Sequence, residues 1–215
     1  PDGPTFFVVE RNTPGLTPGR REVKHGIRLS DTAQVLLQDV VVPADNLVGE
    51  REGEGLKQAN EVFGYTRLMV AAFGLGAGLA ALEKAIAFAK ERRQFGTLLA
   101  EKQGFTHKLL VPNSVRLAAA QAYIEYVADL LDGGTEDRQV EGSVAKLFAS
   151  EVANVAADDA VQALGGYGYC VDFEVEKIRR DARILRIYEG TSEIQQSIIS
   201  IFRMRENVRS RGRFY

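Results

Sequence analysis

Hydrophobic side chains recur at helical spacing through most of the chain after residue 55. Apolar positions three or four residues apart are typical of amphipathic helices. Pro112 is expected to kink or split one of these helices, because proline lacks a backbone N–H. The pattern favours a mainly α protein built as a helical bundle. The predicted helices are four long ones and a short charged one: Leu56 to Arg93, Phe105 to Leu131, Glu141 to Leu164, Glu174 to Asp181 and Glu193 to about Val208.

Small residues are frequent in the first and third predicted helices. Gly74, Gly76 and Gly78 each lower helix propensity by about 1 kcal/mol relative to alanine. We expect another helix or a ligand to approach the chain closely there. The third helix is rich in alanine, and its larger apolar residues are expected to face the core: Val144, Leu147, Phe148, Val152, Val155 and Val161.

The first 50 residues carry the pattern of strands. Phe6 to Val9 is a β-rich run, and Ala33 to Val42 is a second extended stretch. Strands this few do not make a stable sheet by themselves. The charged, glycine-spaced segment Glu50 to Gly55 is the predicted domain boundary. Between the two extended stretches lie residues that favour turns: Asn12, Pro14, Gly15, Pro18 and Gly19.

The composition excludes several functional classes. The chain has 215 residues, of which 45% are hydrophobic, and it can bury one good core. A formal net charge of -2 gives no electrostatic reason to bind nucleic acid. The single cysteine, Cys170, excludes an internal disulfide and suits a reducing compartment. His25 and His107 make no metal cluster. No uninterrupted apolar run reaches about 18 residues, so no membrane span is predicted.

A glutamate stands in the link between the last two predicted helices. Glu189 precedes Gly190 among aromatic and aliphatic neighbours. Desolvation there would raise its pKa above the ~4.3 of a free glutamate, toward the range useful to a general base. Thr191 or Ser192 is expected to cap the following helix, whose unpaired N–H groups suit an anion or a polarised carbonyl. From spacing alone, the alternative is a surface glutamate in a helix–turn–helix link.

Two other segments combine a helix end with residues suited to a phosphate-containing ligand. Arg92 lies in the last turn of the first predicted helix, which Gly96 is expected to terminate. Its planar guanidinium also suits a pyrophosphate. Gly165 and Gly166 end the third helix and would let a ligand approach the backbone closely. They do not form the Gly-x-Gly-x-x-Gly pattern after a strand, so a Rossmann dinucleotide site is not predicted.

In their order and spacing, these segments resemble the acyl-CoA dehydrogenase family. The resemblance rests on the early strands and on ERRQFG with a later glutamine, QALGGYGY, EKIRRDARI and IYEGTSEI. It implies the C-terminal portion of such an enzyme. Residues 1–50 would be the trailing part of its middle β-domain, an incomplete β-barrel. Residues 54–208 would form an up-down four-helix bundle, and residues 209–215 an arginine-rich tail.

The resemblance also implies the chemistry. Glu189 would remove the α-proton of an acyl-CoA thioester while the β-hydride passes to FAD, giving a trans-2-enoyl-CoA. Electrons would then pass to electron-transfer flavoprotein. The enzyme would be a homodimer or homotetramer, in the cytoplasm of a bacterium or the mitochondrial matrix of a eukaryote. The residues implied in binding FAD are Arg92, Phe95, Gln103, Gln162, Gly165, Gly166, Thr191 and Glu193, and those implied near the substrate are Arg67, Tyr188 and Gly190.

Some family members carry the base on the first bundle helix, beside the arginine matched by Arg67. In this chain the preceding residues, Gly64, Tyr65 and Thr66, offer no carboxylate, and Glu61 lies on the wrong register. Two other functions stay open from the sequence. An acyl-CoA oxidase would pass its electrons to oxygen, and a non-catalytic helical bundle would serve only oligomer contacts.

Overall fold

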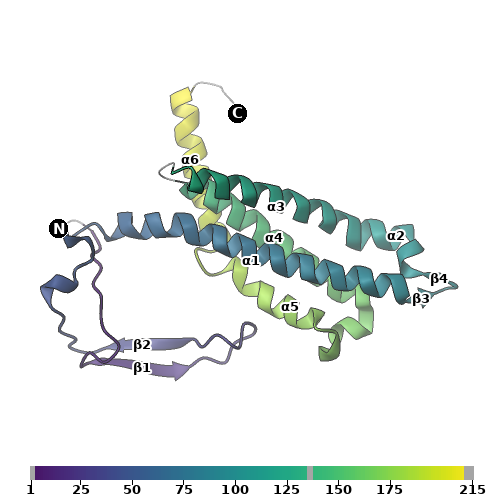
Figure 1. Ribbon diagram of the computed structural model, residues 1–215, viewed down its shortest axis with the longest axis horizontal. Coiled ribbons are helices and arrows are strands. Elements are labelled where there is room, and N and C mark those ends of the chain that lie inside the picture. Colours follow the sequence, from purple (N-terminus) through teal and green to yellow (C-terminus); the bar gives the residue numbers. More distant parts are fainter. Residues whose placement is uncertain (1–2, 135–137, 211–215) are drawn as a thin grey trace. The chain divides into compact units, whose positions relative to one another are not determined.

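The computed structural model describes residues 3–134 and 138–210. The chain divides into two compact units, residues 1–62 and 63–215. Figure 1 labels the strands and α-helices in chain order. They are β1 Leu16–Arg21, β2 Ala33–Leu37, α1 Gly55–Glu91, β3 Arg93–Gln94, β4 Thr97–Leu98, α2 Gln103–Phe105, α3 Val111–Asp132, α4 Gln139–Leu164, α5 Val175–Ala182 and α6 Ser192–Ser210.

The first unit contains one antiparallel hairpin. Strands β1 and β2 pair Leu16 with Leu37 and Pro18 with Val35, and the register shifts between Pro18 and Arg21. Both faces of β2 are exposed along its whole length. A two-stranded hairpin without a covered face is only marginally stable.

Two expectations for the first unit are wrong. The run Phe6 to Val9 forms an isolated bridge, Phe7 with Leu47, and not a strand. Pro18 and Gly19, expected in a turn, lie inside β1. Proline is tolerated on an edge strand or at a bulge, because its missing N–H need not join a ladder there.

The second unit is a helical bundle. In Figure 1, α1, α3, α4 and α5 lie along a common direction and alternate in sense, and α6 leaves the bundle at one end. Helix α4 is its centre, since α3, α5 and α6 all pack against it. The expected up-down helical bundle is therefore confirmed.

The buried face of helix α4 consists mainly of small residues. Ala145, Ala149 and Ala153 are buried, whereas Phe148 and Val155 are exposed. The expectation that the larger apolar residues of this helix face the core is therefore wrong at Phe148 and Val155 and confirmed at Val152 and Val161. Small side chains are selected here because a central helix must admit close neighbours on several sides.

Glycines of α1 face this small-residue surface of α4. A Cβ added to Gly74 would lie 3.1 Å from the backbone oxygen of Ala149. A Cβ added to Gly78 would lie 2.6 Å from Leu117 Cδ2 and 3.5 Å from Ala153 Cα. The expected close approach of another helix is thus confirmed at both glycines, but not at Gly76, where an added Cβ would meet nothing within 4 Å.

The second predicted helix is divided, as Pro112 suggested. The short helix α2 continues as a π-helical segment, Thr106–Leu110, and α3 starts at Val111. Pro112 lies in the first turn of α3. The wider π turn places the break where proline cannot donate its hydrogen bond.

Gly96 does not terminate α1, contrary to expectation. The helix ends at Glu91, and residues 93–98 form the hairpin of β3 and β4. Phe95 and Gly96 are its two turn residues, with φ of +52° and +82°. Two consecutive residues with positive φ are typical of a type I′ hairpin turn, which explains the glycine.

Helix α1 is long and apolar enough to cross a membrane by length and composition alone. Core helices pass the same test, so this is a weak indication. Val70, Ala71 and Ala81 of α1 are buried in the protein core. The predicted arginine-rich tail lies mostly outside the described residues, since these end at residue 210.

Replacing Gly142 with alanine tests the close contact between α1 and α4. The new Cβ would lie 2.9 Å from the backbone oxygen of Gly64. We expect the free energy of unfolding to fall by about 1–2 kcal/mol, because rigid backbone must move. Gly76→Ala is the matched control, since its Cβ meets nothing within 4 Å. That variant should gain up to about 1 kcal/mol. If urea unfolding shows that Gly142→Ala stabilises the protein as much as Gly76→Ala does, this contact is contradicted.

Candidate functional site

The link between α5 and α6 contains two consecutive residues in a left-handed conformation. Glu189 has φ of +55° and Gly190 has φ of +89°. Positive φ is uncommon for a residue other than glycine and persists only where the surrounding structure holds it. A Cβ on Gly190 would lie 2.6 Å from Gln195 Nε2. We call residues 187–192 the glutamate turn.

Two fully buried side chains hold the backbone of the glutamate turn. Gln195 Nε2 donates to the carbonyl oxygens of Glu189 at 2.8 Å and Gly190 at 3.0 Å. Lys146 Nζ donates to the oxygen of Gly190 at 2.6 Å. Neither Lys146 nor Gln195 has measurable exposure to solvent. The turn is therefore anchored both from α6 and from α4.

The start of α6 is capped as expected. Thr191 Oγ1 accepts a hydrogen bond from the backbone N–H of Ile194 at 3.3 Å, so Thr191 is the capping residue of the two candidates. Ser192 is buried and donates instead to Glu151 at 2.8 Å. Glu151 also forms an ion pair with Arg186. These bonds connect the last residue of the glutamate turn, and the residue just before the turn, to α4.

The Glu189 carboxylate is half-buried and faces α1. Thr66 Oγ1 donates to Glu189 Oε2 at 2.6 Å. The sequence offered Thr66 only as a residue unable to act as a base, and its contact with Glu189 was not foreseen. The hydrogen bond fixes the direction of a side chain whose backbone is already held.

Two buried cations lie near this carboxylate. Arg67 is 4% exposed, donates to Ser143 Oγ at 3.3 Å, and places its guanidinium 5.4 Å from the ring centroid of Phe63. Burial lowers the pKa of Arg67, and the nearby Glu189 partly opposes this. Burial lowers the pKa of Lys146 to about 8, with Arg67 as the second cause. Three carboxylates act in the opposite direction: Glu151, Glu189 and Glu193.

The other implied residues of this region surround the turn. Tyr188 is half-buried against the core, and burial, followed by the charge of Glu189, raises its pKa. Glu193 is exposed in the first turn of α6. Its own backbone N–H and the Thr191 hydroxyl bond to its carboxylate and lower its pKa. The structure thus brings Arg67, Tyr188, Glu189, Gly190, Thr191 and Glu193 into one region.

A second group of implied residues lines an open pocket of about 540 Å³. We call it the arginine pocket. Its walls include Arg92, which directly follows α1, and the end of α4. The Arg92 guanidinium lies 5.6 Å from the ring centroid of Tyr167. Its lining includes four residues that the resemblance implies in binding FAD: Arg92, Gln162, Gly165 and Gly166.

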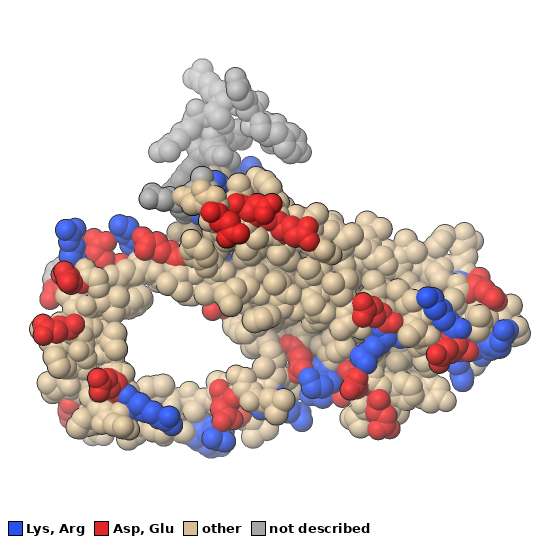
Figure 2. Space-filling view, in the orientation of Figure 1, with Lys and Arg blue, Asp and Glu red and all other residues tan. Residues whose placement is uncertain are grey.

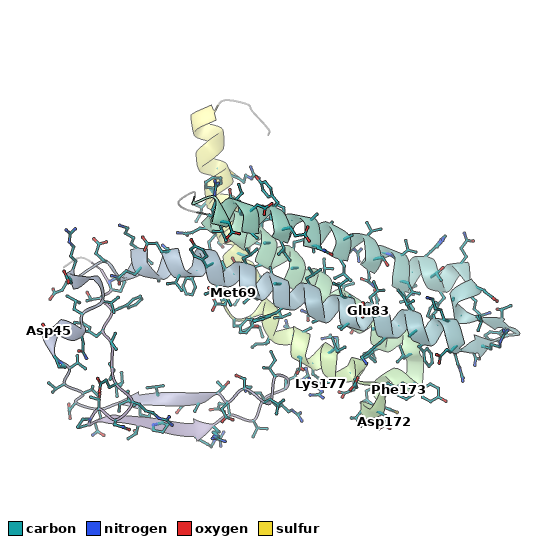
Figure 3. All side chains as sticks on the ribbon, viewed as in Figure 1. Asp45, Met69, Glu83, Asp172, Phe173 and Lys177 are labelled. Atoms are coloured by element: carbon teal, nitrogen blue, oxygen red, sulfur yellow. The ribbon has the colours of Figure 1, made fainter. Side chains whose placement is uncertain are left out.

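An aromatic cluster supports this pocket. The rings of Tyr167 and Phe173 lie 5.0 Å apart, and Phe88 lies 5.9 Å from Tyr167. Phe173 is labelled in Figure 3, in the segment that leads to α5. Edge-on and tilted contacts at these distances are favourable, so they hold the α4–α5 connection against the end of α1.

Phe95 and Gln103 do not join the pocket. Phe95 is 94% exposed at the tip of the β3–β4 hairpin, with Lys102 Nζ 5.5 Å from its ring centroid. Gln103 is exposed at the start of α2. The implied cofactor residues therefore fall into three places in this chain: the glutamate turn, the arginine pocket and the exposed hairpin region.

The sequence did not single out Lys146 and Gln195. Lys146 was the more visible of the two, because it is a lysine between Ala145 and Ala149 on an otherwise small, apolar face of α4. A lysine is almost never fully buried unless it has a partner. Its position was a signal, once the buried face of α4 had been identified correctly.

Comparisons with known proteins identify the family of this chain. Residues 53–201 match the family model of the acyl-CoA dehydrogenase C-terminal domain. An acyl-CoA dehydrogenase of Bacillus subtilis (strain 168) is 44% identical over 92% of this chain and 52% of the relative. The caffeyl-CoA reductase-Etf complex subunit CarC of Acetobacterium woodii is 37% identical over 92% of this chain and 52% of the relative.

A solved structure shows the same fold. Butyryl-CoA dehydrogenase from Megasphaera elsdenii superposes with a TM-score of 0.89 at 38% identity, over 93% of this chain and 51% of that chain. These similarities define the class as that of acyl-CoA dehydrogenase C-terminal domains. The chain belongs to the acyl-CoA dehydrogenase family. It spans about half the length of the curated relatives it matches.

The buried lysine predicts a pH dependence of stability. Its pKa is about 8 in the folded protein and 10.5 ordinarily, so the unfolded chain binds more protons between these values. Stability must then rise with pH across that window. In urea unfolding, wild type should gain stability relative to Lys146→Met as the pH is raised from 8 to about 10. A difference that stays constant over this range would contradict the buried, uncharged state of Lys146 at high pH.

Proposed function

We propose that the complete protein containing this chain is a flavin-dependent acyl-CoA dehydrogenase with Glu189 as its general base. The observation that carries the proposal is the glutamate turn, where buried side chains hold the backbone and Thr66 fixes the carboxylate. Holding a catalytic group in one geometry removes much of the entropy cost of its reaction. A surface glutamate in a simple link would not need this support.

The second carboxylate oxygen is suited to accept a proton. Thr66 donates to Oε2, and no described residue donates to Oε1 of Glu189. In the proposed reaction Oε1 takes the α-proton of an acyl-CoA thioester bound against the turn. A general base must lie within hydrogen-bond reach of the proton that it removes, and a fixed carboxylate with one open oxygen meets this condition.

The turn also offers a donor to polarise the thioester carbonyl. Among the described residues, none accepts a hydrogen bond from the backbone N–H of Glu189. The positive end of α6 begins two residues later, at Thr191. We assign this N–H to the developing enolate oxygen, in the manner of an oxyanion hole. Base and donor then belong to the same residue.

The arginine pocket fits a flavin nucleotide. Arg92 offers a planar fork of donors to a pyrophosphate. A Cβ on Gly165 or Gly166 would meet nothing within 4 Å, so the backbone there borders open space that a ligand can enter. Gln162 adds an amide to the same wall. When bound, the FAD supplies the acceptor for the β-hydride.

Electron-transfer flavoprotein is the proposed electron partner. One relative at 37% identity is named as a subunit of a reductase–Etf complex. The proposed substrate class is acyl-CoA, as in the names of the relatives. Some relatives are named as dehydrogenases and others as reductases. We therefore propose that the electron partner, and not the glutamate turn, determines the direction of the reaction.

We also propose a homodimer or homotetramer. Phe95 and Gln103 lie away from the arginine pocket and are exposed, as suits residues that contact the cofactor of a neighbouring subunit. Apolar side chains are exposed on α1 and α3 as well, including Phe73 and Val115. Figure 2 shows charged residues interspersed near α5 and a mostly uncharged surface over the middle of α1 and α3.

Glu189→Gln tests the base. The change keeps the volume of the side chain but removes the proton acceptor. In the complete protein, we expect acyl-CoA-dependent flavin reduction to slow by about 10²–10⁴-fold, with FAD content unchanged. Stopped-flow absorbance of the flavin measures the rate.

Glu83→Gln is the matched control for this experiment. Glu83 is an exposed carboxylate on α1, labelled in Figure 3, so its replacement should leave the rate unchanged. A Glu189→Gln protein that reduces its flavin at the wild-type rate would place the base elsewhere and reject the proposed role.

Arg92→Ala tests the cofactor site. Loss of the guanidinium should weaken FAD retention at least about tenfold, as expected for a charge-assisted contact, while the far-UV helical signal stays unchanged. Arg93→Ala is the control, because Arg93 is exposed on β3 and outside the pocket lining. Equal FAD affinity in both variants, measured by equilibrium dialysis, would show that Arg92 does not contribute to FAD binding.

A further inference from the structure

We propose that Lys146 is a positioning residue for Glu189. Its ammonium group holds the carbonyl of Gly190 and so keeps the glutamate turn in the left-handed conformation from which the carboxylate projects. This inference rests on the proposed function, because it assigns a role to Lys146 through the base. It identifies a residue of α4 that neither touches the substrate nor belongs to the turn.

The two side chains that bond to the carbonyl of Gly190 come from different parts of the chain. Gln195 is only five residues after Gly190, in the first turns of α6, so it moves together with the turn. Lys146 is 44 residues earlier and belongs to the central helix. Together with the bond from Ser192 to Glu151, it therefore fixes the turn relative to the bundle, and hence relative to Thr66 on α1.

The hydrogen-bond partner of Lys146 indicates why this side chain is buried. Among the described residues, no carboxylate lies within 4.0 Å of its ammonium group, and its hydrogen bond goes to a neutral carbonyl. Burying a charge without an ion pair is costly. A lysine that served only to neutralise charge would pair with an acid. This one is placed to hold backbone instead.

Charged groups from each surrounding element face Lys146. Arg67 comes from α1 and disfavours the protonated amine. Glu151 on α4, Glu189 in the turn and Glu193 on α6 favour it. With its pKa near 8, the amine loses its charge in the alkaline range. A neutral amine is a weaker donor to the carbonyl of Gly190, so the hold on the turn should weaken as the pH rises above about 8.

The experiment uses Lys146→Met in the complete protein, with single-turnover flavin reduction by an acyl-CoA. Met keeps the length and apolar stem of lysine but has no donor. We expect the maximal rate to fall about 10- to 100-fold, because a base displaced by about 1 Å loses that much. The half-saturating acyl-CoA concentration and the FAD content should stay within about twofold of wild type. The wild-type rate should fall above about pH 8, and the variant should lack this limb.

The matched control is Asn154→Leu. Asn154 is also a buried polar residue of α4 whose side chain donates to the backbone of another segment, the carbonyl of Ala182 at 2.9 Å. Its loss should lower stability without moving the rate or its pH profile. A Lys146→Met protein that matches wild type in rate and alkaline limb overturns the proposal, as does an Asn154→Leu protein that reproduces the effects of Lys146→Met.

Two further measurements distinguish a failure of this inference from a misfolded variant and from a failure of the proposed function. If Lys146→Met does not fold, the wild-type profile decides, since the absence of a fall in maximal rate near pH 8 contradicts the positioning role. If wild type itself shows no acyl-CoA-dependent flavin reduction, the proposed function fails. A crystal structure of the variant then tests Lys146 alone. It should show Glu189 out of the left-handed region and its bond to Thr66 lost, and an unchanged turn would reject the inference.

Discussion

The close packing of α4 against its neighbours is the constraint on which the rest of the helical unit depends. Its buried face is lined by alanines, and glycines of α1 meet it at backbone distance. Large side chains on this face would separate the helices by several ångströms. Thr66 would then no longer reach Glu189, and Lys146 would not reach the carbonyl of Gly190. The geometry of the candidate site follows from residues chosen for their small size.

The same packing explains why the site contains buried charge. The space between α1 and α4 is too narrow for water to solvate Arg67 and Lys146, and burial lowers the pKa of both. Such a site is less stable than an apolar core of the same shape. Natural proteins accept this loss where function needs a fixed polar group. Here the buried polar groups lie around one carboxylate, that of Glu189.

How far the sequence could predict the structure depended on whether local or tertiary forces decided each feature. The helices, the break at Pro112 and the cap at Thr191 follow from local chemistry, and the structure confirms them. The buried face of α4 was assigned correctly only in part, and the hairpin at Gly96 was assigned wrongly. Apolar size misled the first assignment, and a helix-end glycine resembles a turn glycine in sequence. Lys146 could not be linked to Gly190, because only the tertiary fold brings them together.

The order of the helices along the chain determines when the candidate site can form during synthesis. Thr66 and Glu189 are 123 residues apart, and contacts of such separation form late because a long loop must close first. A ribosome would release α1, α3 and α4 before the glutamate turn exists. The growing chain therefore lacks the contact between Thr66 and Glu189 while its bundle is incomplete. The Glu189 carboxylate can reach its place beside Thr66 only after the link to α6 has been made, so the candidate site is completed together with the fold.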